Sequence, residues 1–294
     1  MDAALRAAGG QGLAAEQIRA VGAACAEHRL VVIEGAAGTG KSTALRAIGR
    51  IHHAEGQRIL AVSTGGLAAR RLGSELRAAG LDCHDLTTAA LEARVRRGLL
   101  TLDERTTVVW DEAALASTHE QAFLVPHTAT TGARLIAVGD GAQGQPVGAG
   151  GLWHRLGRLA DRTGARAELT QIVRARDPAD RRDQHTFRAG HHQAAIRGLA
   201  DRDRVTVCDT QEQAEDVALH RWNDDRRQGI DSVLFASASN ARIDELNAAA
   251  QALRQLDGQA GHRIVAPRSS SPAPQTTKRS TAGAGPSLFQ RPAR

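Results

Sequence analysis

The chain has 294 residues, enough for one large domain or two domains of medium size. It contains no apolar run long enough to span a bilayer, and its first residues lack the basic segment and apolar core of a secretory signal. The net charge of +6 comes from residues 261–294, which hold six basic residues and no acidic one, so charge alone indicates no nucleic-acid partner.

Strand and helix signals alternate over the first two-thirds of the chain. This alternation predicts an α/β fold, a mostly parallel sheet with helices on both faces, and a first domain over residues 1–164. The predicted strands are four short apolar runs at residues 30–33, 59–63, 107–110 and 135–139. Residues 66–79 and 88–97 carry apolar residues at helical spacing and are predicted helices.

The first strand leads into a glycine-rich segment, Gly-Ala-Ala-Gly-Thr-Gly-Lys-Ser at residues 35–42, and a helix is predicted to follow. Lys41 is the only lysine before Lys278, which indicates a site where a guanidinium cannot replace a compact ammonium. Strand, glycine loop and helix in this order predict a P-loop, whose backbone N–H groups cradle phosphates. A chance Gly/Ala-rich turn is the alternative. The predicted nucleotide-binding residues are Gly35, Ala36, Ala37, Gly38, Thr39, Gly40, Lys41, Ser42 and Thr43, and Ser42 is also predicted to bind Mg²⁺.

Two adjacent acids end the strand at residues 107–110. After a P-loop strand, such a pair is the expected place for Mg²⁺ and the attacking water of a nucleotide hydrolase. Asp111 is the predicted metal ligand, and Glu112 the predicted acceptor of the water's proton. The alternative is a helix start, where Asp and Glu are favourable N-terminal charges.

The strand at residues 135–139 runs into the sequence Gly-Asp-x-x-Gln. An uncharged amide here can hydrogen-bond the γ-phosphate of a nucleotide and lose that bond on hydrolysis, so Gln143 is the predicted sensor. A turn rich in glycine and aspartate is the alternative, but it does not account for the three motifs in this order.

A second, smaller unit is predicted over residues 165–262. It contains predicted strands at residues 205–208 and 232–236 and predicted helices at residues 211–223 and 242–256. Residues 263–294 are rich in Ser, Pro, Ala, Thr and Gly with scattered arginine. Such a segment cannot bury enough apolar area to order itself, so a disordered tail is predicted.

In this order the motifs resemble those of the RecD-like helicases of superfamily 1, most closely the helicase part of TraA-type conjugative relaxases, over roughly residues 10–255. The resemblance implies a P-loop NTPase with a RecA-like first domain and a partial second RecA-like domain. It also implies that Gln17 reads adenine, that residues 62–65 touch single-stranded DNA, and that Arg174 is an arginine finger reaching the γ-phosphate. Ala175 departs from the family, which usually has glutamine there.

The resemblance implies an ATP- and Mg²⁺-dependent DNA helicase or translocase of conjugative transfer. The implied partners are single-stranded DNA and a relaxase or other conjugation proteins. Complete members continue through later motifs that couple hydrolysis to movement, so the chain is expected to be C-terminally truncated. Two alternatives stay open: an ATP-binding module without DNA-coupled turnover, and an inactive fragment. Few aromatic side chains are available to stack on bases; Trp153 and Phe187 are candidates, although each is more often a core residue.

Three cysteines lie far apart, without Cys-x-x-Cys spacing. This usage predicts a cytoplasmic protein with neither a disulfide framework nor a zinc site. The histidine pairs at residues 52–53 and 191–192 lack companion ligands, so they are predicted to be solvated or loop histidines.

Overall fold

The computed structural model describes residues 12–144, 146, 148–173, 175, 177–230, 232–234 and 239–257. The chain divides into two compact units, Met1–Val205 and Thr206–Arg294. Within the described ranges, no helix combines the length and the apolar character needed to cross a membrane. The predicted tail at residues 263–294 lies outside the described residues.

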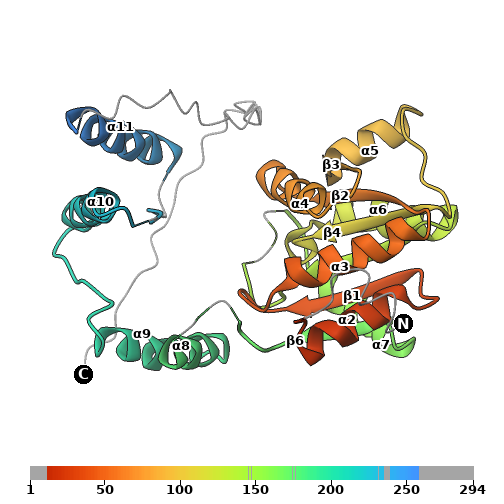
Figure 1. The fold of residues 1–294 in the computed structure, drawn as a ribbon, viewed down its shortest axis with the longest axis horizontal. Helices are drawn as coiled ribbons and strands as arrows, with labels where there is room; N and C mark the ends of the chain where they lie inside the picture. Colours follow the sequence, from red (N-terminus) through yellow and green to blue (C-terminus); the bar gives the residue numbers. More distant parts are fainter. Residues whose placement is uncertain are drawn as a thin grey trace, which may run out of the picture. The chain divides into compact units, whose positions relative to one another are not determined.

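Six parallel strands form one sheet in the order β3-β2-β4-β5-β1-β6 (Figure 1). The strands are β1 Leu30–Gly35, β2 Arg58–Ser63, β3 Cys83–Thr87, β4 Thr106–Asp111, β5 Arg134–Gly139 and β6 Arg166–Leu169. The register aligns Val32 of β1 with Ala137 on one side and with Arg166 on the other. The predicted parallel α/β fold is confirmed, and the four predicted strands are the four inner strands of the sheet.

The inner strands have continuous apolar central segments because helices cover both faces of the sheet. Val108, Val109 and Trp110 of β4, for example, have no exposed surface. The two edge strands, β3 and β6, instead alternate buried residues with partly or fully exposed ones, and neither was predicted. Arg166–Leu169 was expected to belong to the second unit, yet it pairs with β1 in the first, which continues to Val205. The compact unit therefore extends well past the expected boundary at residue 164.

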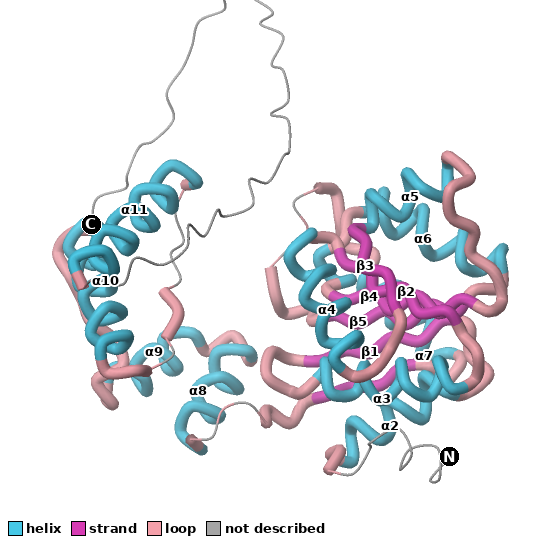
Figure 2. The backbone as a smooth tube through the Cα atoms, turned by 45° about the horizontal axis from the view of Figure 1, so that its top comes forward, coloured by secondary structure: helices cyan, strands magenta, loops and turns pink. Residues whose placement is uncertain are grey.

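Helices cover the sheet in two layers (Figure 1, Figure 2). Right-handed crossovers between parallel strands place the helices before β2 and β3 on one face and those before β4, β5 and β6 on the other. The first layer is α2 Ala15–Cys25, α3 Lys41–Ala54 and α4 Gly66–Ala78; the second is α5 Thr88–Arg96, α6 Thr118–Thr131 and α7 Trp153–Arg162. A short 3-10 helix, η1 Ala113–Leu115, follows β4. The helices predicted at residues 66–79 and 88–97 are confirmed.

Two further helices, α8 Pro178–Arg188 and α9 His192–Ala200, complete the first unit. Helix α8 begins at a strong start signal, because Asp177 caps the helix and Pro178 occupies its first turn. Arg202, just after α9, bridges Asp180 and Asp183 of α8 at 2.8 and 2.7 Å. These ion pairs and their shared packing make α8 and α9 a helical hairpin.

The described part of the second unit contains α10 Gln211–Arg227 and α11 Asn240–Leu256, so both predicted helices are confirmed. The strand predicted at residues 205–208 is wrong, because these residues pair with no other strand. Residues 232–234 are likewise not a strand, and residues 235–236 lie outside the described part of the chain. Arg242 joins the two helices through an ion pair with Glu215 at 2.5 Å.

His52 of α3 is buried and not solvated as predicted, with 1% of its surface exposed. Its Nε2 lies 3.1 Å from the carbonyl oxygen of Ala24, which can only accept, so Nε2 carries the proton. Its Nδ1 then accepts from the Thr107 hydroxyl at 2.9 Å. Burial, together with the charge of Arg134, lowers the pKa of His52 from 6.5 to about 4.

Because the unfolded chain binds a proton at His52 more readily than the folded one, stability is lost as the pH falls through the window from 6.5 to about 4. Linkage gives a free energy of unfolding lower by about 2 kcal/mol at pH 5 than at pH 7 from this group alone. We predict that His52→Gln removes this increment, as measured by urea unfolding at both pH values. An unchanged pH dependence in the variant would contradict the assignment.

Candidate functional site

The loop between β1 and α3 has the conformation that its glycines predict. Gly38 and Gly40 have φ values of 80° and 79°, a region that glycine adopts without strain. A Cβ atom on Gly40 would lie 2.3 Å from Nε2 of Gln17, and one on Gly35 would lie 2.9 Å from Cδ of Lys41. Residues with side chains would therefore displace the neighbours that shape the loop.

Lys41 opens α3 with its side chain folded back over the loop. Its Nζ donates hydrogen bonds to the carbonyl oxygens of Gly35 at 2.6 Å and Ala36 at 3.3 Å. Burial lowers the pKa of Lys41, and the carboxylates of Asp111 and Asp140 oppose that shift. Because the ammonium is partly removed from water, an additional anion placed next to it would be stabilised.

Asp111 and Glu112 lie at the carboxyl end of β4, as predicted. Asp111 is 7% exposed, and its Oδ1 accepts a hydrogen bond from the backbone N–H of Glu112 at 2.9 Å. Burial raises the pKa of both carboxyl groups, and the charge of Asp111 raises that of Glu112 further. A carboxylate with a raised pKa is a better proton acceptor, which suits Glu112 for general-base chemistry.

The predicted site contains a cavity of about 600 Å³, which joins three of the predicted motifs. Another cavity, of about 630 Å³, lies away from this site. The lining of the first cavity includes Lys41, Ser42, Thr43, Asp111, Glu112 and Gln143. Four residues that were not predicted as site residues, Arg46, Arg71, Glu75 and Val173, also line it. The Ser42 hydroxyl and the Asp111 carboxylate are hard oxygen donors of the kind that Mg²⁺ prefers, so the donor set fits this metal.

Asp140 holds the predicted sensor in place. Its carboxylate, with a side chain 2% exposed, accepts from Nε2 of Gln143 at 3.3 Å and from Nη1 of Arg188 at 2.5 Å. Arg188 belongs to α8 and was not predicted, because nothing local distinguishes it among the many arginines of the chain. A second cavity, of about 710 Å³, lies between α8 and the P-loop and is also lined by Gln143. The predicted arginine finger, Arg174, lies outside the described residues.

Glu34, the last residue before the glycine-rich segment, ties the sensor loop to β1. Its carboxylate accepts from the backbone N–H of Gly141 at 2.6 Å and from Nε1 of Trp153 at 2.7 Å. Trp153 is 4% exposed and is therefore a core residue, whereas Phe187 is 51% exposed beside the ring of His192. A charged residue at the end of a buried strand was the sequence signal for Glu34.

Two neighbouring residues of α2 make different contacts: Gln17 holds the P-loop from the side, and Glu16 holds the segment that follows β6. Gln17 is 5% exposed, and its Nε2 donates to the carbonyl oxygens of Thr39 at 3.2 Å and Gly40 at 3.3 Å. The Glu16 carboxylate accepts from the backbone N–H groups of Thr170 at 2.7 Å and Gln171 at 2.9 Å. Burial would raise the pKa of Glu16, but these bonds and the Thr170 hydroxyl outweigh it and lower the pKa.

Comparison with known proteins gives a matching family model, described as AAA domain, over residues 12–210. The chain is 30% identical over 216 residues to the conjugal transfer protein TraA of Rhizobium radiobacter, covering 74% of this chain and 19% of the relative. It is 28% identical over 224 residues to TraA of Agrobacterium fabrum, covering 76% of this chain and 20% of the relative. The chain thus spans about a fifth of the length of these relatives, and the predicted resemblance to the TraA type is confirmed.

Among solved structures, the chain is similar to the Pif1 helicase of Candida albicans, with a TM-score of 0.47 and 16% identity over 79% of this chain and 60% of that one. It is also similar to Bacteroides sp. Pif1 in complex with ADP-AlF4, with a TM-score of 0.43 and 15% identity over 81% of this chain and 56% of that one.

Gln17 could support the P-loop or recognise adenine, and substitution of this residue distinguishes the two roles. Gln17→Ala removes two hydrogen bonds to the P-loop, each worth about 1 kcal/mol. We expect affinity for ATP, GTP and inorganic triphosphate to fall together by about tenfold, measured by calorimetry in Mg²⁺ buffer, while Gln228→Ala on the second unit changes none of them. A loss confined to ATP would instead assign Gln17 to adenine.

Proposed function

This chain belongs to the AAA domain family, and from that membership we propose that it is an ATP-hydrolysing DNA helicase or translocase domain of the conjugative transfer type. The observation that carries the proposal is the single cavity that joins the P-loop, the Asp111–Glu112 pair and Gln143. Phosphate binding, metal binding, water activation and phosphate sensing all require groups at one place, and this cavity supplies a group for each.

The binding step falls to Lys41 and the backbone N–H groups of residues 35–42, which together favour the negative charge of a triphosphate. In the proposed complex Lys41 exchanges its hydrogen bonds to Gly35 and Ala36 for phosphate oxygens. Ser42 and Asp111 are the proposed ligands of Mg²⁺, which when bound neutralises charge on the phosphate oxygens. The nine predicted nucleotide-binding residues of this segment remain proposals, with the P-loop geometry as their support.

In the hydrolytic step, Glu112 accepts a proton from the water that attacks the γ-phosphorus, while Lys41 stabilises the charge that grows on the phosphate oxygens. Gln143 leaves Asp140 to donate to the γ-phosphate and returns to Asp140 when that phosphate departs. Arg188 of α8 bonds to the same carboxylate, so a change in the hydrogen bond between Gln143 and Asp140 also alters the contact between Asp140 and α8. This shared carboxylate is the proposed link between hydrolysis and movement. Arg174 remains the proposed arginine finger.

The proposed substrate for movement is single-stranded DNA, and the proposed partners are a relaxase or other conjugation proteins, in a cytoplasmic setting. The segment at residues 62–65, proposed to touch DNA, contains the last two residues of β2 and the two that follow, at the same sheet edge as the nucleotide cavity. Leu67 beyond it is 75% exposed. A second candidate is an ATP-binding module without DNA-coupled turnover. It is favoured by the second unit, whose described residues form two helices and no strand.

The first prediction of this function concerns the lysine. Lys41→Ala and Lys41→Arg should both lower the rate of ATP hydrolysis by about 10²- to 10³-fold, because neither side chain places a compact charge against the transferring phosphate. Phosphate release in a coupled assay measures the rate. Lys278→Ala, a change at the other lysine of the chain, is the matched control and should leave the rate unchanged. Full activity of Lys41→Arg would refute the proposed role.

The second prediction separates the two candidate functions. Single-stranded DNA should raise the hydrolysis rate at least tenfold if the chain is a translocase, and Arg188→Ala should lower this stimulation while ATP binding changes less than threefold. Oligothymidylate titrations of the full chain provide the measurement. Hydrolysis that DNA does not change, with ATP binding intact, would favour the module without DNA-coupled turnover.

A further inference from the structure

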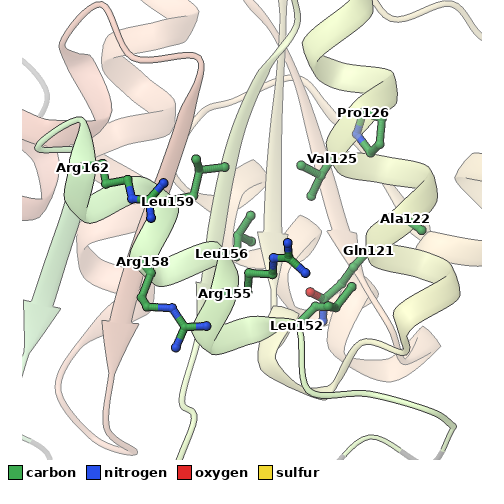
Figure 3. Close-up of a pocket in the computed structure, with 10 residues that line it drawn as sticks. All are labelled: Gln121, Ala122, Val125, Pro126, Leu152, Arg155, Leu156, Arg158, Leu159 and Arg162. Atoms are coloured by element: carbon green, nitrogen blue, oxygen red, sulfur yellow. The ribbon is translucent and has the colours of Figure 1, made fainter.

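A groove of about 630 Å³ runs between α6 and α7, away from the nucleotide cavity, with which it shares no lining residue. Figure 3 shows Arg155, Leu156 and Leu159 of α7 facing Val125 and Pro126 of α6. Leu159 is 48% exposed, whereas Leu156 is 7% exposed and forms the floor. The full lining is Gln121, Ala122, Val125, Pro126, Leu152, Arg155, Leu156, Arg158, Leu159 and Arg162.

The charge of this groove has one sign. Three of its lining residues are arginines of α7, at positions 155, 158 and 162, and none carries a carboxylate. Over the described ranges no ion pair forms with any of these three arginines, whereas Arg96 of α5 and Arg166 of β6 each pair with a neighbouring acid. The groove therefore presents an uncompensated positive row, spaced three and four residues apart on one helix face.

The α6 wall adds a polar feature. Pro126 lies inside the helix and has no N–H, so it cannot donate the helical hydrogen bond to the carbonyl oxygen of Ala122. Both residues line the groove. Gln121, by contrast, uses its amide N–H group on the carbonyl oxygen of Ala116 at 3.0 Å. The apolar floor is thus bordered by a backbone acceptor on one side and by arginines on the other.

We propose that this groove docks an acidic amphipathic helix of a partner protein, with leucine-like side chains seated between α6 and α7 and carboxylates facing the arginine row. The two ends of the row lie seven positions apart on α7, about 10 Å, which matches two turns of a partner helix. A nucleic acid is the weaker match, because the lining contains no aromatic side chain for bases to stack on and its floor is apolar.

A fluorescent helical peptide with leucines at every third or fourth position, flanked by glutamates, tests the proposal by anisotropy with the full chain. The triple variant R155E/R158E/R162E should weaken its binding at least tenfold. The matched variant R94E/R97E/R105E, which reverses three exposed arginines elsewhere on the first unit, should change it less than twofold. A peptide with serine in place of each leucine should bind at least tenfold more weakly than the parent.

Leu159→Ser provides a second variant whose exposed side chain is not needed for folding, and it should weaken binding about fivefold. Retained thermal stabilisation by Mg·ATP shows that each variant is folded. Equal losses in both triple variants, or equal binding of the serine peptide, would reduce the effect to general charge attraction and overturn the proposal. So would an oligothymidylate that binds through these three arginines while the peptide does not bind.

Discussion

The site depends on one constraint, the parallel alignment of three neighbouring strands whose carboxyl ends meet at one edge of the sheet. In the sheet order β5 lies between β4 and β1, so the motifs that follow these strands are neighbours in space although far apart in sequence. Strand β1 delivers the P-loop, β4 delivers Asp111 and Glu112, and β5 delivers Asp140. The register fixes their relative heights, since Glu34 of β1 is level with Gly139 of β5. The packing that buries these strands on both faces therefore also brings the site residues together at the carboxyl edge of the sheet.

Three of the polar side chains at this edge are bonded to other groups of the protein. Lys41 bonds to loop carbonyl oxygens, Gln143 bonds to Asp140, and Gln17 bonds to the end of the P-loop. A nucleotide must therefore compete with internal bonds, so its net gain is the difference between two sets of hydrogen bonds. In the proposed mechanism, this exchange links phosphate binding to a movement of the protein. Releasing Gln143 from Asp140 alters the only carboxylate that receives Arg188 in the described part of the chain.

Sequence predicted the inner half of the molecule better than its edges. Continuous apolar runs identified β1, β2, β4 and β5, because a strand buried on both faces must be apolar throughout. The edge strands β3 and β6 alternate, as in His84 and Glu168, and such short alternating segments resemble loops when no partner strand is known. The consequence was an early domain boundary, since β6 could be assigned to the first sheet only through its pairing with β1.

The same limit applied to the site. Roles for motif residues such as Lys41 and Asp111 could be proposed from sequence because the chemistry requires them at a given spacing from a strand, and these roles stay predictions. Glu16 and Arg188 act through tertiary contacts, with backbone N–H groups or a carboxylate far along the chain, and no local spacing marks them. His52 was misjudged for a related reason, because its burial follows from the position of α2 and β4 and not from its own neighbours in sequence.

Glu112 has a backbone conformation that local preference disfavours. It has a left-handed conformation, with φ of 56°, in which a residue with a Cβ is disfavoured by about 1 kcal/mol or more. Glycine at that position would remove the strain but also the carboxylate. The conformation is imposed from both sides: β4 is fully buried before it, and η1, held by a hydrogen bond from Leu115 N–H to the Glu112 carbonyl oxygen at 2.9 Å, follows it. The turn places a carboxyl group with a raised pKa at the cavity, which supports the proposed role of Glu112 in proton transfer.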